Sequence, residues 1–76
     1  MRDEQIAEIL TKENGEFRKL SDEHRDLDGK LTGFSAKHYL SAEEEMERKR
    51  LQKMKLMKKD RMAEIIRQYR KDHSVN

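Results

Sequence analysis

The chain has 76 residues, of which 33% are hydrophobic and 45% charged, with three glycines, no proline and no cysteine. This length allows one small domain with a limited core, and the lack of cysteine excludes disulfides and thiolate metal sites. No apolar run is long enough for a signal peptide or a membrane-spanning helix, so the expected compartment is the cytoplasm and no membrane partner is expected. The composition disfavours a β-sheet and fits long, solvent-exposed helices.

The net charge is only +2, but it is unevenly distributed along the chain. Residues 1–47 carry 13 acidic and 7 basic side chains, whereas residues 48–76 carry 3 acidic and 11 basic side chains. Two halves of opposite sign suit a pair of helices that fold back on each other. Disorder is the competing interpretation of such a polar composition, and a regular apolar spacing argues against it.

The first predicted element is a short helix over residues 3–12. Ile6, Ile9 and Leu10 fall on one face of this helix. Asn14 and Gly15 follow, and asparagine is a good helix cap whereas glycine is a poor residue inside a helix. We therefore expect a break or a kink near Asn14. Whether one kinked helix or two separate helices precede the loop stays open.

The first arm of a hairpin is predicted over residues 15–32, and its strongest signal is a narrow heptad seam of the coiled-coil kind. The seam residues follow one another at alternating steps of three and four, beginning in the preceding short helix. Thr32 and Gly33 are expected to end the arm, because glycine is frequent where a helix leaves right-handed geometry. The predicted hairpin seam consists of Leu10, Glu13, Phe17, Leu20, His24, Leu27 and Leu31, together with Lys58 from the second arm.

Residues 33–40 are predicted to form a loop, and residues 41–71 a second, longer arm. Ser41 and Glu44 match a capping box, in which each side chain bonds a backbone amide at the start of the helix. The apolar stripe of this arm is about twice as wide as the seam of the first arm, so one partner helix cannot cover it. We expect the surplus to bind a second copy or another protein. The predicted interaction face is Leu51, Met54, Met57, Met62, Ile65 and Tyr69.

Together these elements predict an all-α fold in one domain over residues 1–76. A short N-terminal helix precedes an antiparallel, coiled-coil-like helical hairpin, and we expect a homo-oligomer, with a dimer favoured. If the turn centres near residue 36, Leu20 faces Leu51 and Glu13 lies near Lys58. We predict that Glu13 and Lys58 are polar partners that fix the register.

The stretch EFRKLSDEHRDLD, followed by YLSAEEE and LQKMKLMKKDRM, resembles the small bacterial family often called YdcH-like. The resemblance covers essentially the whole chain. It implies a coiled-coil-like helical hairpin without an assigned activity and without catalytic or cofactor residues. The sequence differs from the family pattern at Lys58, where leucine is expected, and at Arg61, where glutamate is expected. Both differences make the second arm more basic and its seam more polar.

The residues themselves also predict no catalytic, cofactor or metal site. His24, His38 and His73 share no helical spacing that would bring three metal ligands together. Carboxylates are plentiful, but general acid–base catalysis needs a carboxylate in a desolvated cleft, which a two-helix hairpin does not offer. We therefore predict that the protein is not an enzyme and uses no cofactor.

The stretch RKRLQKMKLMKKDR, residues 48–61, holds eight basic side chains, and we call it the basic run. The basic run suggests an alternative function, in which the protein is a nucleic-acid-associated basic protein that uses Arg48 to Arg61. The run contains no aromatic residue to stack on bases and no recognised nucleic-acid motif. We therefore expect at most weak, salt-sensitive binding to nucleic acid, and we favour an adaptor or regulator that binds proteins through its helical faces. The acidic residues expected opposite the run are Glu13, Glu16, Asp22 and Glu23.

Overall fold

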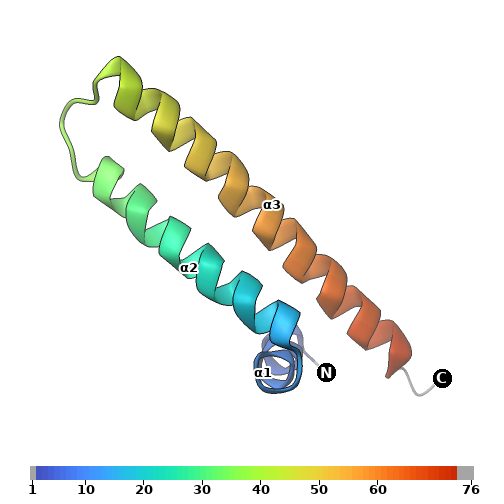
Figure 1. Cartoon of the computed structure of the whole chain (residues 1–76). Coiled ribbons are helices and arrows are strands. Elements are labelled where there is room, and N and C mark those ends of the chain that lie inside the picture. The colour runs from blue at the N-terminus through green and yellow to red at the C-terminus, as the bar shows by residue number, and fades with distance from the viewer. Residues whose placement is uncertain (1, 74–76) are drawn as a thin grey trace.

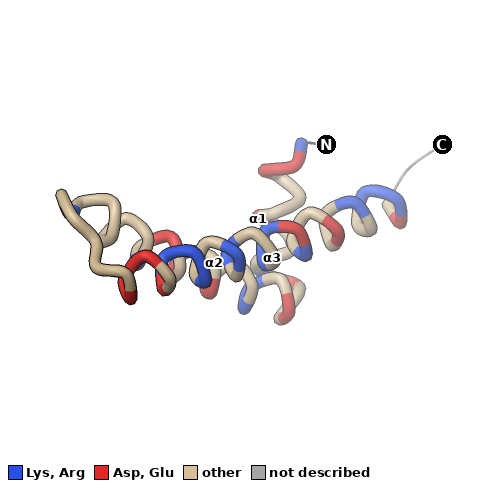
Figure 2. The backbone as a smooth tube through the Cα atoms, turned by 90° about the horizontal axis from the view of Figure 1, so that it is seen from above, with Lys and Arg blue, Asp and Glu red and all other residues tan. Residues whose placement is uncertain are grey.

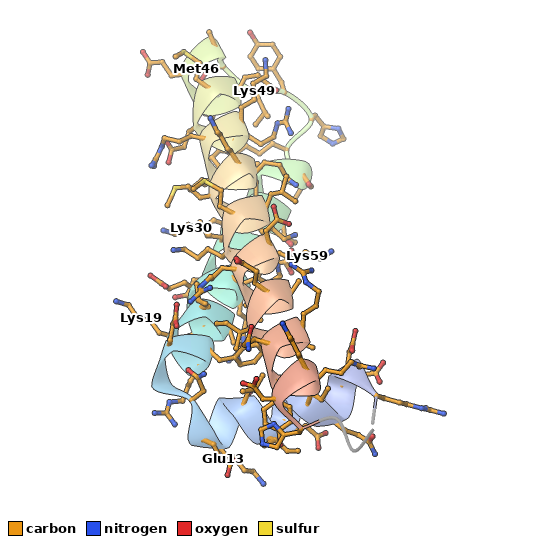
Figure 3. All side chains as sticks on the ribbon, turned by 90° about the vertical axis from the view of Figure 1, so that its right-hand side faces the viewer. Glu13, Lys19, Lys30, Met46, Lys49 and Lys59 are labelled. Atoms are coloured by element: carbon orange, nitrogen blue, oxygen red, sulfur yellow. The ribbon has the colours of Figure 1, made fainter. Side chains whose placement is uncertain are left out.

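The computed structural model describes residues 2–73 and shows three helices (Figure 1). Helix α1 spans Asp3–Glu13, α2 spans Gly15–Ser35 and α3 spans Ala42–Asp72. Helices α2 and α3 form an antiparallel hairpin, and α1 crosses its open end; it is seen almost end-on in Figure 1 and from the side in Figure 3. The predicted all-α hairpin with a short N-terminal helix is confirmed, and the molecule is elongated, with extents of 53 × 19 × 17 Å.

A short break at Asn14 separates α1 from α2. The backbone of Asn14 is extended, with φ −123° and ψ 109°, and its side-chain oxygen accepts a 2.9 Å hydrogen bond from the amide of Phe17. This bond satisfies one of the free amides at the start of a helix. The chain therefore forms two helices before the hairpin turn rather than one kinked helix.

The end of α2 lies three residues beyond the predicted position, because the helix passes through Gly33 and ends at Ser35. No glycine in residues 2–73 has a positive φ, and a side chain added at Gly33 would meet no atom within 4 Å. A glycine inside a helix costs only about 1 kcal/mol, and Phe34 offsets part of that cost by packing against the buried Leu31 and its neighbours. The connection between the arms is therefore residues 36–41, shorter than the predicted loop.

Helix α3 begins with the predicted capping box. Ser41 Oγ accepts a hydrogen bond from the amide of Glu44 at 3.1 Å, and Glu44 Oε1 accepts one from the amide of Ser41 at 3.1 Å. The Glu44 carboxylate also pairs with Lys37 from the connection. Acidic side chains in the first turn suit the positive end of the helix dipole, so the sequence fixes this start strongly.

The buried side chains form two separate clusters. The base cluster lies at the open end of the hairpin and joins all three helices, whereas the turn cluster joins only α2 and α3. Burial of apolar surface in these clusters supplies the main favourable free energy of folding. The base cluster consists of Ile6, Leu10, Phe17 and Ile65, and the turn cluster of Leu27, Leu31 and Leu51.

The register of the hairpin differs from the predicted one. Lys58 Nζ lies 3.5 Å from Glu23 Oε1, so the two arms are related about a midpoint near residue 40 rather than 36. The predicted pairing of Glu13 with Lys58 is therefore wrong. Leu51 also packs in the turn cluster instead of facing Leu20. The shift arises because α2 continues past its expected end and moves the turn along the chain.

Candidate interaction surface

The predicted seam residues occupy the hairpin interior to different degrees. Glu13 is exposed, because the break after it turns the chain, and it points away from the hairpin at the foot of Figure 3. Lys58 is half-buried and its ammonium reaches Glu23. The buried seam residues are Leu10, Phe17, Leu27 and Leu31, and the half-buried ones are Leu20, His24 and Lys58.

Most of the predicted interaction face packs inside the molecule itself. Helix α1 contacts both α2 and α3, so two helices cover the wide stripe of α3 that one partner could not. This corrects the expectation that the surplus stripe stays free for another molecule; of the six residues only Met57 is strongly exposed, at 62%. The covered residues are Leu51 and Ile65, which are buried, and Met54, Met62 and Tyr69, which pack against the two clusters.

The apolar surface that remains exposed lies mainly on α3, and we call the surface that carries Met46, Leu56 and Met57 the outer side of α3. Leu56 and Met57 stand near its middle, and Met46 is 72% exposed near its start. Tyr39 adds an exposed ring in the connection between the arms. Scattered exposed apolar residues are ordinary on a protein surface, but here three lie on one helix that is 31 residues long.

A shallow groove runs along one side of the hairpin beside Met57. Its floor is lined by Leu20, Met54, Met57 and Lys58 and encloses about 310 Å³, and we call it the side groove. A second hollow continues along the same flank towards the turn, where Met54 and Lys58 meet charged groups of α2. Exposed apolar surface rimmed by charge is typical of a site that binds another protein.

Ion pairs across the hairpin neutralise part of the basic run. Lys55 Nζ lies 2.6 Å from Asp28, and Arg61 Nε lies 3.0 Å from Glu16; the Lys58 pair described above completes the three. Figure 2 shows basic and acidic segments interleaved along both arms rather than gathered on one of them. The other arm therefore neutralises three of the eight basic side chains of the run, namely Lys55, Lys58 and Arg61.

Further pairs form within α3. Arg48 pairs with Glu45, and Arg50 pairs with Glu47, each three residues earlier. Of the four acidic residues expected opposite the run, Glu16 and Glu23 make contact with it, whereas Asp22 pairs with Arg25 of its own helix. Lys49, Lys53 and Lys59 have no ion-pair partner within residues 2–73.

These contacts lower the pKa of several carboxyl groups. The hydrogen bond from Lys55 lowers the pKa of the Asp28 carboxyl below its ordinary value. Hydrogen bonds from Arg48 and Arg50 likewise lower the pKa of Glu45 and of Glu47. A carboxyl group whose pKa is depressed stays ionised at neutral pH and does not serve as a proton donor there. These carboxylates therefore stay charged and keep their pairs with the basic side chains at neutral pH.

His24 is the one seam residue with an unmet hydrogen-bonding group. Its Nε2 atom is buried and has no hydrogen-bond partner within the described residues. The residue stands on α2 between Leu20 and Leu27, so it falls between the base cluster and the turn cluster. A buried polar atom without a partner costs free energy, so we expect His24 to weaken the middle of the hairpin.

The described residues contain neither a metal-binding cluster nor a membrane-spanning helix. Between residues 2 and 73, no three side chains of the metal-binding types His, Cys, Asp and Glu lie close enough together to hold an ion. Over the same residues, no helix is both long enough and apolar enough to cross a membrane.

Sequence reasoning expected acidic residues opposite the basic run but missed the side groove and the individual partners of the cross-helix ion pairs. Both depend on the register, which was placed about four residues too early. A signal was present in the charges, since the acidic residues at 16, 23 and 28 oppose the basic residues at 61, 58 and 55 only when the turn centres near residue 40. Ion pairs alone seldom define a register, and Gly33 pointed to the earlier turn.

The fold and its surface define a small all-α protein built as a charge-matched helical hairpin. The chain belongs to the family described as "Protein of unknown function (DUF465)", whose family model matches residues 17–66. The match confirms the resemblance to a small family without an assigned activity, but it covers the hairpin from Phe17 to Ile66 rather than essentially the whole chain and leaves α1 outside it. No curated protein and no solved structure matches the chain.

Proposed function

We propose that this protein is a non-enzymatic interaction module of the cytoplasm. It acts as an adaptor or regulator that binds helical proteins, including a second copy of itself, through the outer side of α3. The observation that carries the proposal is the exposure of Met57, 62%, at the middle of a 31-residue helix and at the edge of the side groove. Methionine side chains are flexible and polarizable and suit surfaces that accept a helix.

The surroundings of Met57 support a helical partner. Lys58 beside it is held by Glu23, so the rim of the groove carries both signs of charge. The hairpin presents its grooves along its length, and a helix laid in such a groove places apolar residues at steps of three and four against it. Leu56 and Met46 extend the apolar contact along α3. A non-enzymatic role is consistent with carboxyl groups that are paired and ionised.

The proposal is tested by substituting Met57 and identifying the proteins that no longer bind. The full chain, immobilised, is exposed to an extract of its native cells, and retained proteins are identified by mass spectrometry. We expect Met57→Glu to lose the specific partners, because a carboxylate at the groove edge would have to be desolvated on binding. Lys59→Glu is the matched control, since it is exposed, adds the same kind of side chain and points to the opposite flank from Lys19 and Lys30 (Figure 3).

The control should retain the partners that the unaltered chain retains. Circular dichroism on each variant establishes that the helices are intact. Retention of the same proteins by the unaltered chain and by both variants would contradict the proposal, because binding would then not depend on the outer side of α3.

A further inference from the structure

We propose that α3 pairs with α3 of a second copy, antiparallel, about a two-fold axis at Met57. This inference rests on the proposed function and names one partner of the same surface. Three observations support this pairing. When a second copy of α3 is laid antiparallel against the first, each charge in the pattern meets an opposite charge. The residues that carry the pattern are exposed, and α3 is long enough for them to meet.

The pattern repeats every seven residues along α3. Before Met57, the residue fourteen positions earlier is acidic and the residue seven positions earlier is basic. After Met57, the residue seven positions later is acidic and the residue fourteen positions later is basic. A seven-residue repeat keeps these positions on one side of the helix, with a drift of about 20° per repeat that a left-handed supercoil absorbs. The five positions are Glu43, Arg50, Met57, Glu64 and Lys71.

The structure leaves these side chains exposed, although Arg50 pairs with Glu47 and Glu64 with Arg61 of the same helix; a contact with a second copy exchanges these exposed pairs, which contribute little stability. All five residues are exposed, and the side chains of Arg50 and Glu64 are each 60% accessible. Arg50 Nη1 lies 3.5 Å from Met54 Sδ, and Met54 lines the side groove with Met57. Further along α3, Glu64 and Lys71 line one hollow together. The pattern thus follows the outer flank of α3 beside the groove.

Antiparallel pairing about Met57 matches every charge. Arg50 then lies opposite Glu64 of the second copy, and Glu43 lies opposite Lys71 of the second copy. The two-fold axis repeats each pair, and Met57 of each copy meets the other at the axis. A parallel pairing in the same register places Glu43 against Glu43 and Arg50 against Arg50, and like charges at such positions select against it. The self-complementary contact is of the isologous kind that closes a dimer.

The size of the surface suits a weak dimer. Helix α3 has 31 residues, so it is about 46 Å long and about 10 Å wide; a contact along its exposed flank covers about 460 Å², below the roughly 800 Å² that each partner buries in a specific complex. Apart from Met57 and its apolar neighbours the contact is polar, and exposed ion pairs add orientation more than affinity. We therefore place the dimer in the micromolar range or weaker.

The test is a charge exchange measured by analytical ultracentrifugation of the full chain in low-salt buffer. Arg50→Glu places glutamate against Glu64 twice in the dimer and should weaken self-association about tenfold. Glu64→Arg should do the same by placing arginine against Arg50. The double variant carries both changes, has the unaltered net charge, and should recover the original association within about threefold.

Lys59→Glu again serves as the matched control, because it makes the same change of charge away from the proposed contact, and it should leave association within about twofold of the unaltered chain. Circular dichroism confirms that each variant is helical. Either of two results overturns the inference: an unaltered chain that stays monomeric at all concentrations, or single variants that weaken the dimer without recovery in the double variant.

These results are distinguishable from a failure of the proposed function. A monomeric chain whose binding to other proteins still depends on Met57 leaves the interaction module standing and removes only the second copy as its partner. Recovery in the double variant supports the antiparallel pairing whatever the extract experiment shows, because it measures contact between two copies alone.

Discussion

The two ends of the hairpin are held together by different amounts of packing. At the base, α1 lies across the ends of α2 and α3, and the buried residues keep between 1% and 8% of their surface, with Ile6 and Phe17 at 1%. At the turn only α2 and α3 meet, and the buried residues keep between 4% and 8% of their surface. Two helices in contact bury a narrow seam, whereas a third helix closes the cluster on another side. The short first helix is therefore what makes the base a core.

The layer between the two ends is polar. His24 keeps a buried nitrogen without a partner, and Lys58 reaches Glu23 across the hairpin. Such a layer separates the two apolar clusters instead of joining them, so opening of the turn end need not disturb the base. The base cluster is then expected to set the overall stability, and the turn end to open at lower free energy.

Removing the largest buried side chain tests this difference most severely. Phe17→Ala should lower the free energy of unfolding by about 4 kcal/mol, against about 2–3 kcal/mol for Leu27→Ala in the turn cluster. A domain of this size has about 3–5 kcal/mol in all, so the Phe17 variant should be largely unfolded. Urea titration followed by circular dichroism measures both. Equal losses at the two positions would contradict a base that dominates stability.

Replacing His24 in the polar layer should reduce the difference in stability between the base end and the turn end of the hairpin. His24→Leu removes the unpartnered nitrogen and adds apolar contact between the clusters, so the free energy of unfolding should rise by about 1 kcal/mol. The melting temperature measures the change. His38→Leu, in the exposed connection, is the control and should change it little. A lower melting temperature for His24→Leu would show that the imidazole is stabilising where it stands.

Acid should weaken the turn end through its paired carboxylates. The pKa of Asp28 is lower in the folded chain than its ordinary value because Lys55 donates to it, so the unfolded chain binds a proton more readily. The stabilisation from this pair is present above the ordinary carboxyl range, about pH 4, and is lost as pH falls through the folded pKa. Urea titrations between neutral pH and pH 3 should show a shallower decline for Asp28→Asn than for the unaltered chain.

The smallest expected effect concerns nucleic acid and the lysines towards the turn end. Lys49 and Lys53 are exposed and carry positive charge without an ion-pair partner in the described part of the chain. We expect weak, sequence-blind binding to DNA or RNA that fades at about 0.15 M salt, because it depends on counterion release. Fluorescence anisotropy with mixed-sequence oligonucleotides at two salt concentrations measures it. Submicromolar binding at the higher salt would favour the nucleic-acid interpretation instead.

The sequence predicted the elements better than their contacts. Asn14 and Ser41 identified the starts of α2 and α3, because a helix start depends on a hydrogen bond between near neighbours. The end of α2 was misplaced at Gly33, since an exposed glycine is tolerated when the residues after it still pack. A misplaced turn shifts every contact between the arms, which is why the pairing of Glu13 with Lys58 failed although each helix was found.

The methionines of α3 offer the most direct test of where binding takes place. Met57 is exposed beside the side groove, whereas Met62, five residues further on, packs against the base cluster. In methyl NMR spectra of the methionine-labelled full chain at rising concentration, the account predicts that the Met57 signal shifts and that the Met62 signal stays in place. A spectrum in which Met62 moves as far as Met57, or in which Met57 does not move at all, would contradict the claim that a second copy binds the outer side of α3.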